Sequence, residues 1–332
     1  MMRRSRWHVA LIGSVLSLFV VSSILSAQLA AGRLHVHFID VGQADGILMM
    51  DDAKRCVILI DSGDTRYPNS ASNFKAYLSK HVPTGGEINL AVVSHPHNDH
   101  LGSMQWVLEN YRVKTYIDNG QPYPSRIYDN LMAVVRQQRQ QHLEYYPYAS
   151  VPGNKDAVCG PNGPRAHVLY PQSGLDPEDC TQNANNCSVV MKLTFGQTSF
   201  LFPGDAEEEE EEILLKDARV KAELRATVLK VPHHGSDTSS SADFLDAVRP
   251  SLMVISAGKK DVGTNARYKH PRLSTVQRLL GFAGARTTAD MIDVYDAAKR
   301  QWTQLQIWGG LHVTAKDGTI VLSTDGSAVK KN

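Results

Sequence analysis

Residues 95–100 of the chain read His95-Pro96-His97-Asn98-Asp99-His100 and directly follow the apolar segment 89–94. Three histidines and a carboxylate within six residues, with a proline among them, fit neither one helix face nor an alternating strand. A loop that folds its side chains toward one point fits them better, and such groups bind zinc, manganese or iron. An exposed histidine-rich loop is the alternative, but the buried strand predicted just before it gives the loop a rigid base.

The elements predicted around this loop alternate between strands and helices. Residues with useful chemistry follow strands, which favours a layered α/β domain with a site at the carboxyl ends of its strands. Hydrophobic residues make up 42% and charged residues 21%, as in globular proteins, and the net charge of +1 gives no general argument for a polyanion partner. We expect strands at 34–40, 46–50, 56–60, 89–94, 166–170, 189–194, 198–202, 227–231, 252–256 and within 305–324, and helices at 73–81, 103–111, 128–142, 206–216 and 274–282.

The N-terminal segment, residues 1–32, differs from the rest of the chain. Arginines at positions 3, 4 and 6 precede an apolar run, residues 9–25, and then small residues. This order is typical of a secretory signal peptide with cleavage after Ala27, so we expect export to the periplasm or the extracellular space. The alternative is an uncleaved membrane anchor. Residues 33–332 are predicted to form one domain, with a loop-rich, cysteine-containing insertion at about 145–185.

Four cysteines, at positions 56, 159, 180 and 187, permit disulfides in an exported chain. We expect a bridge between Cys180 and Cys187, or from Cys159 to either of them. Cys56 lies beside a predicted strand and is interpreted as a buried free thiol.

One loop rarely completes a metal site, so distant partners are expected at other strand ends. Asp205 follows a predicted hairpin and is interpreted either as a carboxylate that bridges two metals or as a helix N-cap. His233 and His234 follow the strand at 227–231, as expected of a ligand and a neighbour that supports it. His270 precedes a helix, where a histidine without a metal role is an equal alternative.

Taken in order, these motifs resemble the metallo-β-lactamase superfamily and, more narrowly, the extracytoplasmic hydrolase domain of the competence protein ComEC and its stand-alone relatives. The resemblance covers roughly residues 34–326. It is carried by the segments 38–45, 60–63, 95–100, 185–190, 203–205, 232–236, 268–271, 317–320 and 324–326.

The resemblance implies a four-layer αββα sandwich with one or two Zn²⁺ ions, or Mn²⁺, at one edge. It assigns one metal to His95 and His97 and the other to Asp99 and His100. It further implies that Asp205 bridges the two metals, that His233 or His234 completes the set of ligands, and that Asp61 orients the histidine loop. Asn185 and Asn186 stand where many superfamily members have a third histidine, which implies a weak first site or a single metal. Ala44 and Gly46 depart from the usual Gln-Gly-Asp-Ser, so a hydroxyl contact is missing there.

The resemblance also implies an exported phosphodiesterase, nuclease-like, that acts on nucleic acid or another phosphodiester. A water activated by the metals, with Asp99 among their ligands, would attack, and His234 or His270 would protonate the leaving group. Two interpretations stay open for the basic residues Lys259, Lys260, Arg267 and Lys269: contacts to phosphate, or, equally, solvated surface side chains. The alternatives are an envelope esterase acting on phosphorylcholine-bearing teichoic acid, a β-lactam hydrolase and a non-catalytic metal-binding protein. No stable protein partner is evident.

Two further patterns are interpreted as structural. The glutamates at 207–212 are expected to be a solvated helix start favoured by the helix dipole. His35 and His37 are expected to be structural or exposed rather than metal ligands.

Overall fold

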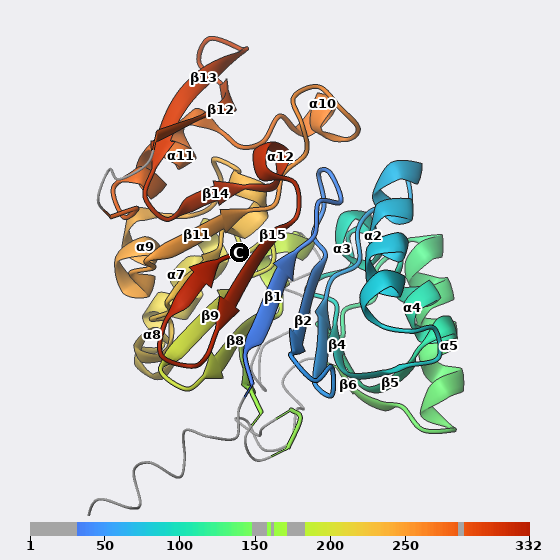
Figure 1. Ribbon diagram of the computed structural model, residues 1–332. Helices are drawn as coiled ribbons and strands as arrows, with labels where there is room; N and C mark the ends of the chain where they lie inside the picture. Colours follow the sequence, from blue (N-terminus) through green and yellow to red (C-terminus); the bar gives the residue numbers. More distant parts are fainter. Residues whose placement is uncertain (1–31, 148–157, 161–162, 171–182, 285–288) are drawn as a thin grey trace, which may run out of the picture. The chain divides into compact units, whose positions relative to one another are not determined.

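Two β-sheets face each other across an apolar core in the computed structural model (Figure 1). The structure describes residues 32–147, 158–160, 163–170, 183–284 and 289–332. The segment predicted to be a signal peptide or anchor therefore lies outside the described residues, apart from its last position. Within the described ranges, no helix is both long enough and apolar enough to cross a membrane.

In the described part of the chain, the first sheet has eight strands in the order β16-β15-β1-β2-β3-β4-β5-β6. The strands from β3 to β6 run parallel, while β1 pairs antiparallel with both β2 and β15. The bounds are β1 Leu34–Phe38, β2 Ile47–Asp51, β3 Val57–Ile60, β4 Glu87–Val92, β5 Arg112–Asp118, β6 Glu144–Pro147, β15 Ile320–Thr324 and β16 Val329–Lys331.

The second sheet has six described strands in the order β14-β11-β10-β9-β8-β7. The strands β9, β10, β11 and β14 run parallel, so their carboxyl ends share one edge. The bounds are β7 Arg165–Tyr170, β8 Val190–Phe195, β9 Thr198–Phe202, β10 Val228–Lys230, β11 Leu252–Ile255 and β14 Leu311–Val313.

Apolar residues on both faces of each sheet create the four layers. Along β4, Leu90 and Val92 enter the core between the sheets, whereas Ala91 and Val93 enter the core under the outer helices. Between the sheets, the rings of Phe38 and Phe202 lie 6.3 Å apart. The first sheet is covered by α2 (Pro68–His81), α4 (Met104–Asn110) and α5 (Arg126–Arg139), and the second by α7 (Glu208–Lys216), α8 (Ala218–Glu223), α9 (Ala242–Val248) and α11 (Leu273–Leu280) (Figure 1). The predicted αββα sandwich is confirmed.

Several elements were not expected from the sequence. The alternating run of β5 was not interpreted as a strand, and β6 falls where the loop-rich insertion was expected to begin. An antiparallel hairpin, β12 (Ala289–Asp296) with β13 (Gln301–Trp308), forms a separate two-stranded sheet. Short helical segments complete the fold: α3 (Asn98–Leu101), η1 (Ala184–Cys187), η2 (Pro232–Gly235), α10 (Asn265–Tyr268) and α12 (Thr314–Asp317).

The disulfide prediction was wrong for two of the cysteines. Cys56 is bonded to Cys159, with their Cα atoms 5.3 Å apart, so Cys56 is not a free thiol and Cys159 does not pair with Cys180 or Cys187. The two partners are 103 residues apart in sequence, and only the folded sandwich brings them together. Cys187 is also disulfide-bonded. Cys180, the partner predicted for Cys187, lies outside the described residues.

Candidate metal centre

The carboxyl ends of four parallel strands meet where the two sheets face each other. Asp61 follows β3, and the loop 95–100 follows β4 and turns into α3. From the second sheet, Asp205 follows β9 and His234 lies in η2 after β10. Because each residue comes directly after a buried strand, its backbone position is fixed by the sandwich.

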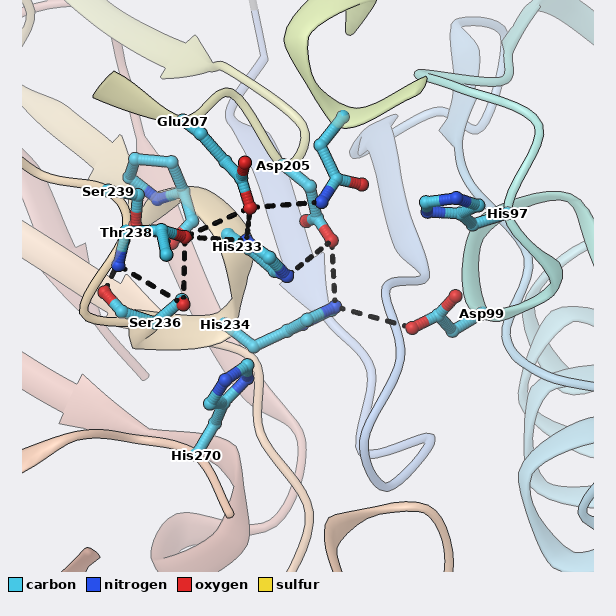
Figure 2. A network of polar contacts seen from close by, with 12 residues as sticks. His97, Asp99, Asp205, Glu207, His233, His234, Ser236, Thr238, Ser239 and His270 are labelled. Atoms are coloured by element: carbon cyan, nitrogen blue, oxygen red, sulfur yellow. Dashed lines mark hydrogen bonds and ion pairs between the residues drawn. The ribbon is translucent and has the colours of Figure 1, made fainter. Parts of the chain in front are cut away.

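The tightest polar cluster joins residues of both sheets. One ligand atom each from Asp45, His100, Asp205 and His234 lies within 4.8 Å of all the others, and all four residues are buried. The Nε2 atom of His100 lies 3.1 Å from Asp205 Oδ2, and the Nε2 atom of His234 lies 3.4 Å from the same oxygen. Asp99 adjoins the cluster, with its Oδ2 atom 3.7 Å from His234 Nε2 (Figure 2).

This donor set fits a divalent cation. The Nε2 atom of His234 is buried and has no hydrogen-bond partner among the described residues, although a buried polar atom is normally satisfied. Its other ring nitrogen is occupied by the carbonyl oxygen of Ser256 at 2.8 Å, so Nε2 is the free ligand atom. Two imidazole nitrogens with carboxylate oxygens are ligands that zinc, manganese and iron accept.

Asp61 fixes the orientation of His100. Its Oδ2 atom lies 2.8 Å from His100 Nδ1, and its Oδ1 atom accepts the backbone N–H of Ser94 at 2.7 Å. This leaves His100 Nε2 directed at Asp205, as expected for a carboxylate that orients a metal-binding imidazole. Asp61 itself has a positive φ of 57°, a conformation that non-glycine residues rarely adopt. Burial lowers the pKa of His100, but Asp205 and Asp61 outweigh burial and raise it well above its ordinary value.

Lys230 is a member of this cluster that sequence reasoning missed. Its side chain is 1% exposed, and its ammonium group contacts the carboxylate of Asp45, lies 3.4 Å from Asp205 Oδ1 and donates to the carbonyl oxygen of Gly204 at 2.8 Å. Burial lowers the pKa of Lys230, but Asp45 and Asp205 outweigh burial and raise it. The available signal was a lysine between Leu229 and Val231 in an otherwise apolar strand. A charged side chain buried at such a position needs a partner of opposite charge.

His95 and His97 are not among the four residues of the tightest cluster, but the ring of His95 lies 4.1 Å from that of His100. Their rings contact each other, with His95 Nε2 2.9 Å from His97 Nδ1. Ser94 Oγ lies 3.1 Å from His95 Nδ1. Burial lowers the pKa values of both histidines, that of His95 well below its usual range, which favours the neutral imidazole that binds a metal through nitrogen. The structure thus brings all the expected ligands of this loop to the site in two groups. His100 belongs to the cluster and Asp99 adjoins it, whereas His95 and His97 form a pair beside it.

The glutamate run forms the start of α7, as expected, and Glu208, Glu209 and Glu212 are exposed, but the expectation of a solvated run was wrong for its other two helical members. Glu210 and Glu211 are completely buried: Glu210 accepts the backbone N–H of Ser188, and Glu211 accepts the N–H groups of Ser240 and Ser241. Burial raises the pKa values of both carboxyl groups. The run therefore ties α7 to loops that surround the site.

Glu207 connects this run to the paired histidines (Figure 2). Its Oε1 atom lies 3.0 Å from His233 Nδ1 and accepts from Thr238 Oγ1 at 2.9 Å and from Asn185 Nδ2 at 3.2 Å. Burial raises the pKa of Glu207, but these partners outweigh burial, His233 foremost, and lower it to about 2. Asn186 lies further out, where its amide donates to Glu209 at 3.1 Å. Glu207, rather than Asp205, is the N-cap residue of α7.

The paired histidines have divergent roles because the chain reverses sharply at η2. His233 and His234 have φ values of 47° and 53°, both in the left-handed region. Two adjacent non-glycine residues in this region store about 1–3 kcal/mol each, a feature that concentrates at functional sites. The turn directs His234 into the metal cluster and leaves His233 at its rim, 3.9 Å from Asp205.

A cavity of about 640 Å³ opens beside the cluster. His270 lies in its wall, where its Nδ1 atom is 3.2 Å from Gln43 Nε2, and its ring is 5.4 Å from that of His233. Of the residues expected to contact phosphate, Arg267 lines this cavity, whereas Lys259 and Lys260 line a different one. The remaining wall includes Arg66, His97, Asp99, Tyr123, Asn185, Asp205, His233, His234, Tyr268 and Arg272.

Comparisons with known proteins agree with the motifs. A family model described as the metallo-beta-lactamase superfamily matches residues 47–158. ComE operon protein 3 of Bacillus subtilis is 28% identical over 256 residues, which cover 74% of this chain and 30% of that protein. Recombination protein 2 of Haemophilus influenzae is 27% identical over 275 residues, which cover 82% of this chain and 29% of that protein. The chain thus spans about 30% of the length of these curated relatives.

Solved structures show weaker similarity. Human tRNase Z, short form, is 13% identical, with a TM-score of 0.35 over 66% of this chain and 91% of that one. The metallo-β-lactamase MIM-1 from Novosphingobium pentaromativorans is 13% identical, with a TM-score of 0.34 over 64% of this chain and 85% of that one. The chain resembles the metallo-β-lactamase superfamily and the ComEC-like proteins within it. The family match and the cluster of aspartates and histidines together support a metal-dependent hydrolase.

Proposed function

Starting from a metal-dependent hydrolase of the metallo-β-lactamase fold, we propose that the chain is an exported phosphodiesterase of the nuclease-like kind, with nucleic acid as its substrate class. One observation carries the choice of substrate. The cavity beside the metal cluster is lined by three guanidinium groups, those of Arg66, Arg267 and Arg272. Arginine is the side chain that best matches the oxygens of a phosphate group, so an anionic phosphodiester is favoured over a neutral ester.

Zn²⁺ or Mn²⁺ is the proposed cofactor. His100, His234, Asp99 and Asp205 would hold one ion, with His95 and His97 available for a second that shares Asp205. When bound, the ion supplies a Lewis acid that activates water and offsets charge developing on a phosphoryl oxygen. Asp205 has the pKa needed for this role: burial raises it, but His100, His234 and Lys230 outweigh burial and hold it well below its usual range.

The remaining side chains would position the substrate. Glu207 holds the ring of His233 by Nδ1, which leaves Nε2 3.9 Å from Asp205 Oδ2 in a side chain that lines the cavity. From there an imidazole can hydrogen-bond to a leaving oxygen. His270 lies across from it, fixed by Gln43. His234, by contrast, has one nitrogen on Ser256 and the other in the cluster, so we assign it to the metal rather than to proton transfer.

The test is hydrolysis of bis(p-nitrophenyl) phosphate and of single-stranded DNA by the chain lacking residues 1–27, with Mn²⁺ or Zn²⁺ added. Asp205→Ala should lose both activities and bind less metal. Asp246→Ala removes an exposed carboxylate whose ion pair, in the described part of the chain, is with Arg249, and should change neither. Metal binding without cleavage of either substrate would reject the phosphodiesterase and favour an envelope esterase or a non-catalytic metal-binding protein.

Export is the second part of the proposal and has its own test. Expressed with its full N-terminus in a bacterium, the protein should be recovered outside the cytoplasm with Gln28 as its first residue. Mass spectrometry of the intact chain distinguishes this outcome from an uncleaved anchor, which would leave the full mass in the membrane fraction. Full-length protein in the cytoplasm would refute export.

A further inference from the structure

Arg66 is the guanidinium in the cavity that the protein holds most firmly. It follows β3 in the segment Asp61-Ser62-Gly63-Asp64-Thr65-Arg66, and it bends back onto Asp64. Its Nε atom lies 3.0 Å from Asp64 Oδ1, its Nη2 atom lies 2.7 Å from Asp64 Oδ2, and its backbone N–H donates to Oδ1 at 2.8 Å. This is the two-pronged geometry in which an arginine and a carboxylate pair most strongly.

Asp64 is a buried residue held in place by the fold, not a surface carboxylate. Its side chain is 1% exposed, against 40% for Arg66. Its backbone N–H donates to Ser70 Oγ at 2.9 Å, which ties it to the first turn of α2. A buried carboxylate therefore fixes one edge of the guanidinium and leaves the other edge toward the cavity, so little side-chain entropy remains to be lost on binding.

The free edge of Arg66 lies beside the metal cluster. Its Nη2 atom is 3.9 Å from Asp99 Oδ1, beyond hydrogen-bond distance, and no hydrogen bond from Nη1 occurs among the described residues. Arg66 can therefore still donate to an oxygen atom in the cavity. A ligand that lies between this free edge and a cation held by Asp99 is favoured if it carries negative charge, because the cation and the guanidinium would both attract it.

The other two arginines of the cavity are held differently. Arg267 is exposed and lies over the ring of Tyr268, 5.7 Å from its centroid. Arg272 donates through Nη2 to the carbonyl oxygen of Tyr268 at 3.1 Å and lies over the ring of Tyr295. Neither is paired to a buried carboxylate as Arg66 is, so only Arg66 combines a fixed position with a vacant edge at the cluster.

We propose that Arg66 is the residue that binds a non-bridging oxygen of the phosphodiester, and that Asp64 is its positioning residue. This inference rests on the proposed function and makes it more specific. The Arg66 guanidinium would hold the phosphoryl group against the metal centre, whereas Arg267 would contact the more distant part of the nucleic acid. A neutral ester offers no anionic oxygen and therefore gains less from Arg66 than a phosphodiester does.

The experiment compares Arg66→Gln, Arg66→Lys and the double variant Asp64→Asn/Arg66→Gln with the parent protein. The double variant keeps the test valid if the single change leaves Asp64 as an unpaired buried charge. Arg55→Gln is the matched control, because Arg55 is 82% exposed and outside the cavity. Three quantities are measured: metal content, KM and kcat for bis(p-nitrophenyl) phosphate, and the Kd of inorganic phosphate by calorimetry on metal-loaded protein.

Loss of a charge-assisted pair of hydrogen bonds should raise KM and the phosphate Kd by about 10- to 100-fold, with metal content unchanged. Arg66→Lys should recover only part of the loss, because an ammonium group lacks the planar fork. Unchanged phosphate binding in Arg66→Gln would overturn the inference. A loss of metal in parallel with binding would also overturn it, since Arg66 would then act by holding Asp99.

The phosphate titration separates this inference from the proposed function. If the parent cleaves no phosphodiester but binds phosphate at least tenfold more tightly than Arg66→Gln, the anion site stands and the proposed activity fails. If the parent cleaves bis(p-nitrophenyl) phosphate with the same KM as Arg66→Gln, the activity stands and the assigned role of Arg66 fails. A parent that binds no inorganic phosphate refutes the anion site directly.

Discussion

Replacing Lys230 by methionine should destabilise the metal-free protein far more than the metal-loaded one. The ammonium group is buried between Asp45 and Asp205, and the change to methionine keeps most of the side-chain volume, so packing changes little. Removing one partner of a buried ion pair leaves an uncompensated charge and costs about 3–5 kcal/mol. We expect the free energy of unfolding without metal to fall by that amount.

A divalent cation should restore part of this loss, because it supplies positive charge to the same carboxylates. Ligand binding to the native state stabilises it by RT ln(1 + [L]/Kd), which is about 2.7 kcal/mol at a concentration of 100 Kd. The stabilisation by Mn²⁺ or Zn²⁺ should therefore be larger in Lys230→Met than in the parent. Asp45→Asn combined with Lys230→Met should regain stability without metal, since it removes one of the two orphaned charges.

The assay is urea unfolding followed by circular dichroism, in a chelator and then in Mn²⁺. Lys114→Met is the control: Lys114 forms a surface pair with Glu87 at 2.7 Å and is 51% exposed, so its loss should cost less than about 1 kcal/mol. If metal-free Lys230→Met unfolds within about 1 kcal/mol of the parent, the ammonium does not compensate these carboxylates and the reasoning fails.

Three further predictions follow from contacts away from Lys230. Glu207→Ala should free His233 and lower kcat by about 10- to 100-fold while metal content stays constant, as measured by steady-state kinetics and metal analysis; a matching loss of metal would contradict it. Replacing Cys56 and Cys159 by serine opens a loop of 103 residues and should lower the free energy of unfolding by at most about 4.7 kcal/mol in urea titrations, without loss of metal. Burial, followed by the charges of His81 and His35, lowers the pKa of His37 from 6.5 to about 4. Because the unfolded chain then binds a proton at a higher pH than the folded one, the free energy of unfolding should fall by up to about 3 kcal/mol as the pH drops from 6.5 to 4. A similar pH dependence in His37→Gln would refute this.

Controls for these predictions exist within the same elements. Glu212→Ala removes a glutamate of the same run that is 67% exposed and pairs with Lys216, so kcat should not change. For the pH experiment, His142→Gln is the matched control, because His142 is exposed.

The parts of the site that were predictable have local signals. The loop 95–100 and Asp205 follow buried strands, so the rule that sites gather at the carboxyl ends of parallel strands placed them together before any coordinates were known. The apolar run at 89–94 identified β4 because it is buried on both faces. The identity of the metal ligands remains a prediction.

The missed parts depend on contacts between distant segments. Nothing near Lys230 in the sequence indicates Asp45, which is 185 positions away but touches it in the fold. The pairing of Cys56 with Cys159 is likewise set by the sandwich. The glutamate run was misjudged because composition alone cannot show that Glu210 and Glu211 enter the interior to accept backbone N–H groups. The alternation of polar and apolar residues at the start of β5 was a local signal of a strand that sequence reasoning missed.

The division of the metal cluster between the two sheets has a consequence for how the protein matures. His100 comes from the first sheet and Asp205 from the second, 105 residues later, so their contact forms only after both halves have docked. A nascent chain that ends before β9 holds the histidine loop without the carboxylate of Asp205 opposite it. The contacts of the cluster therefore depend on the completed fold: a partly folded chain lacks the set of side chains that would hold a cation, so it cannot assemble the site before the two sheets have packed together.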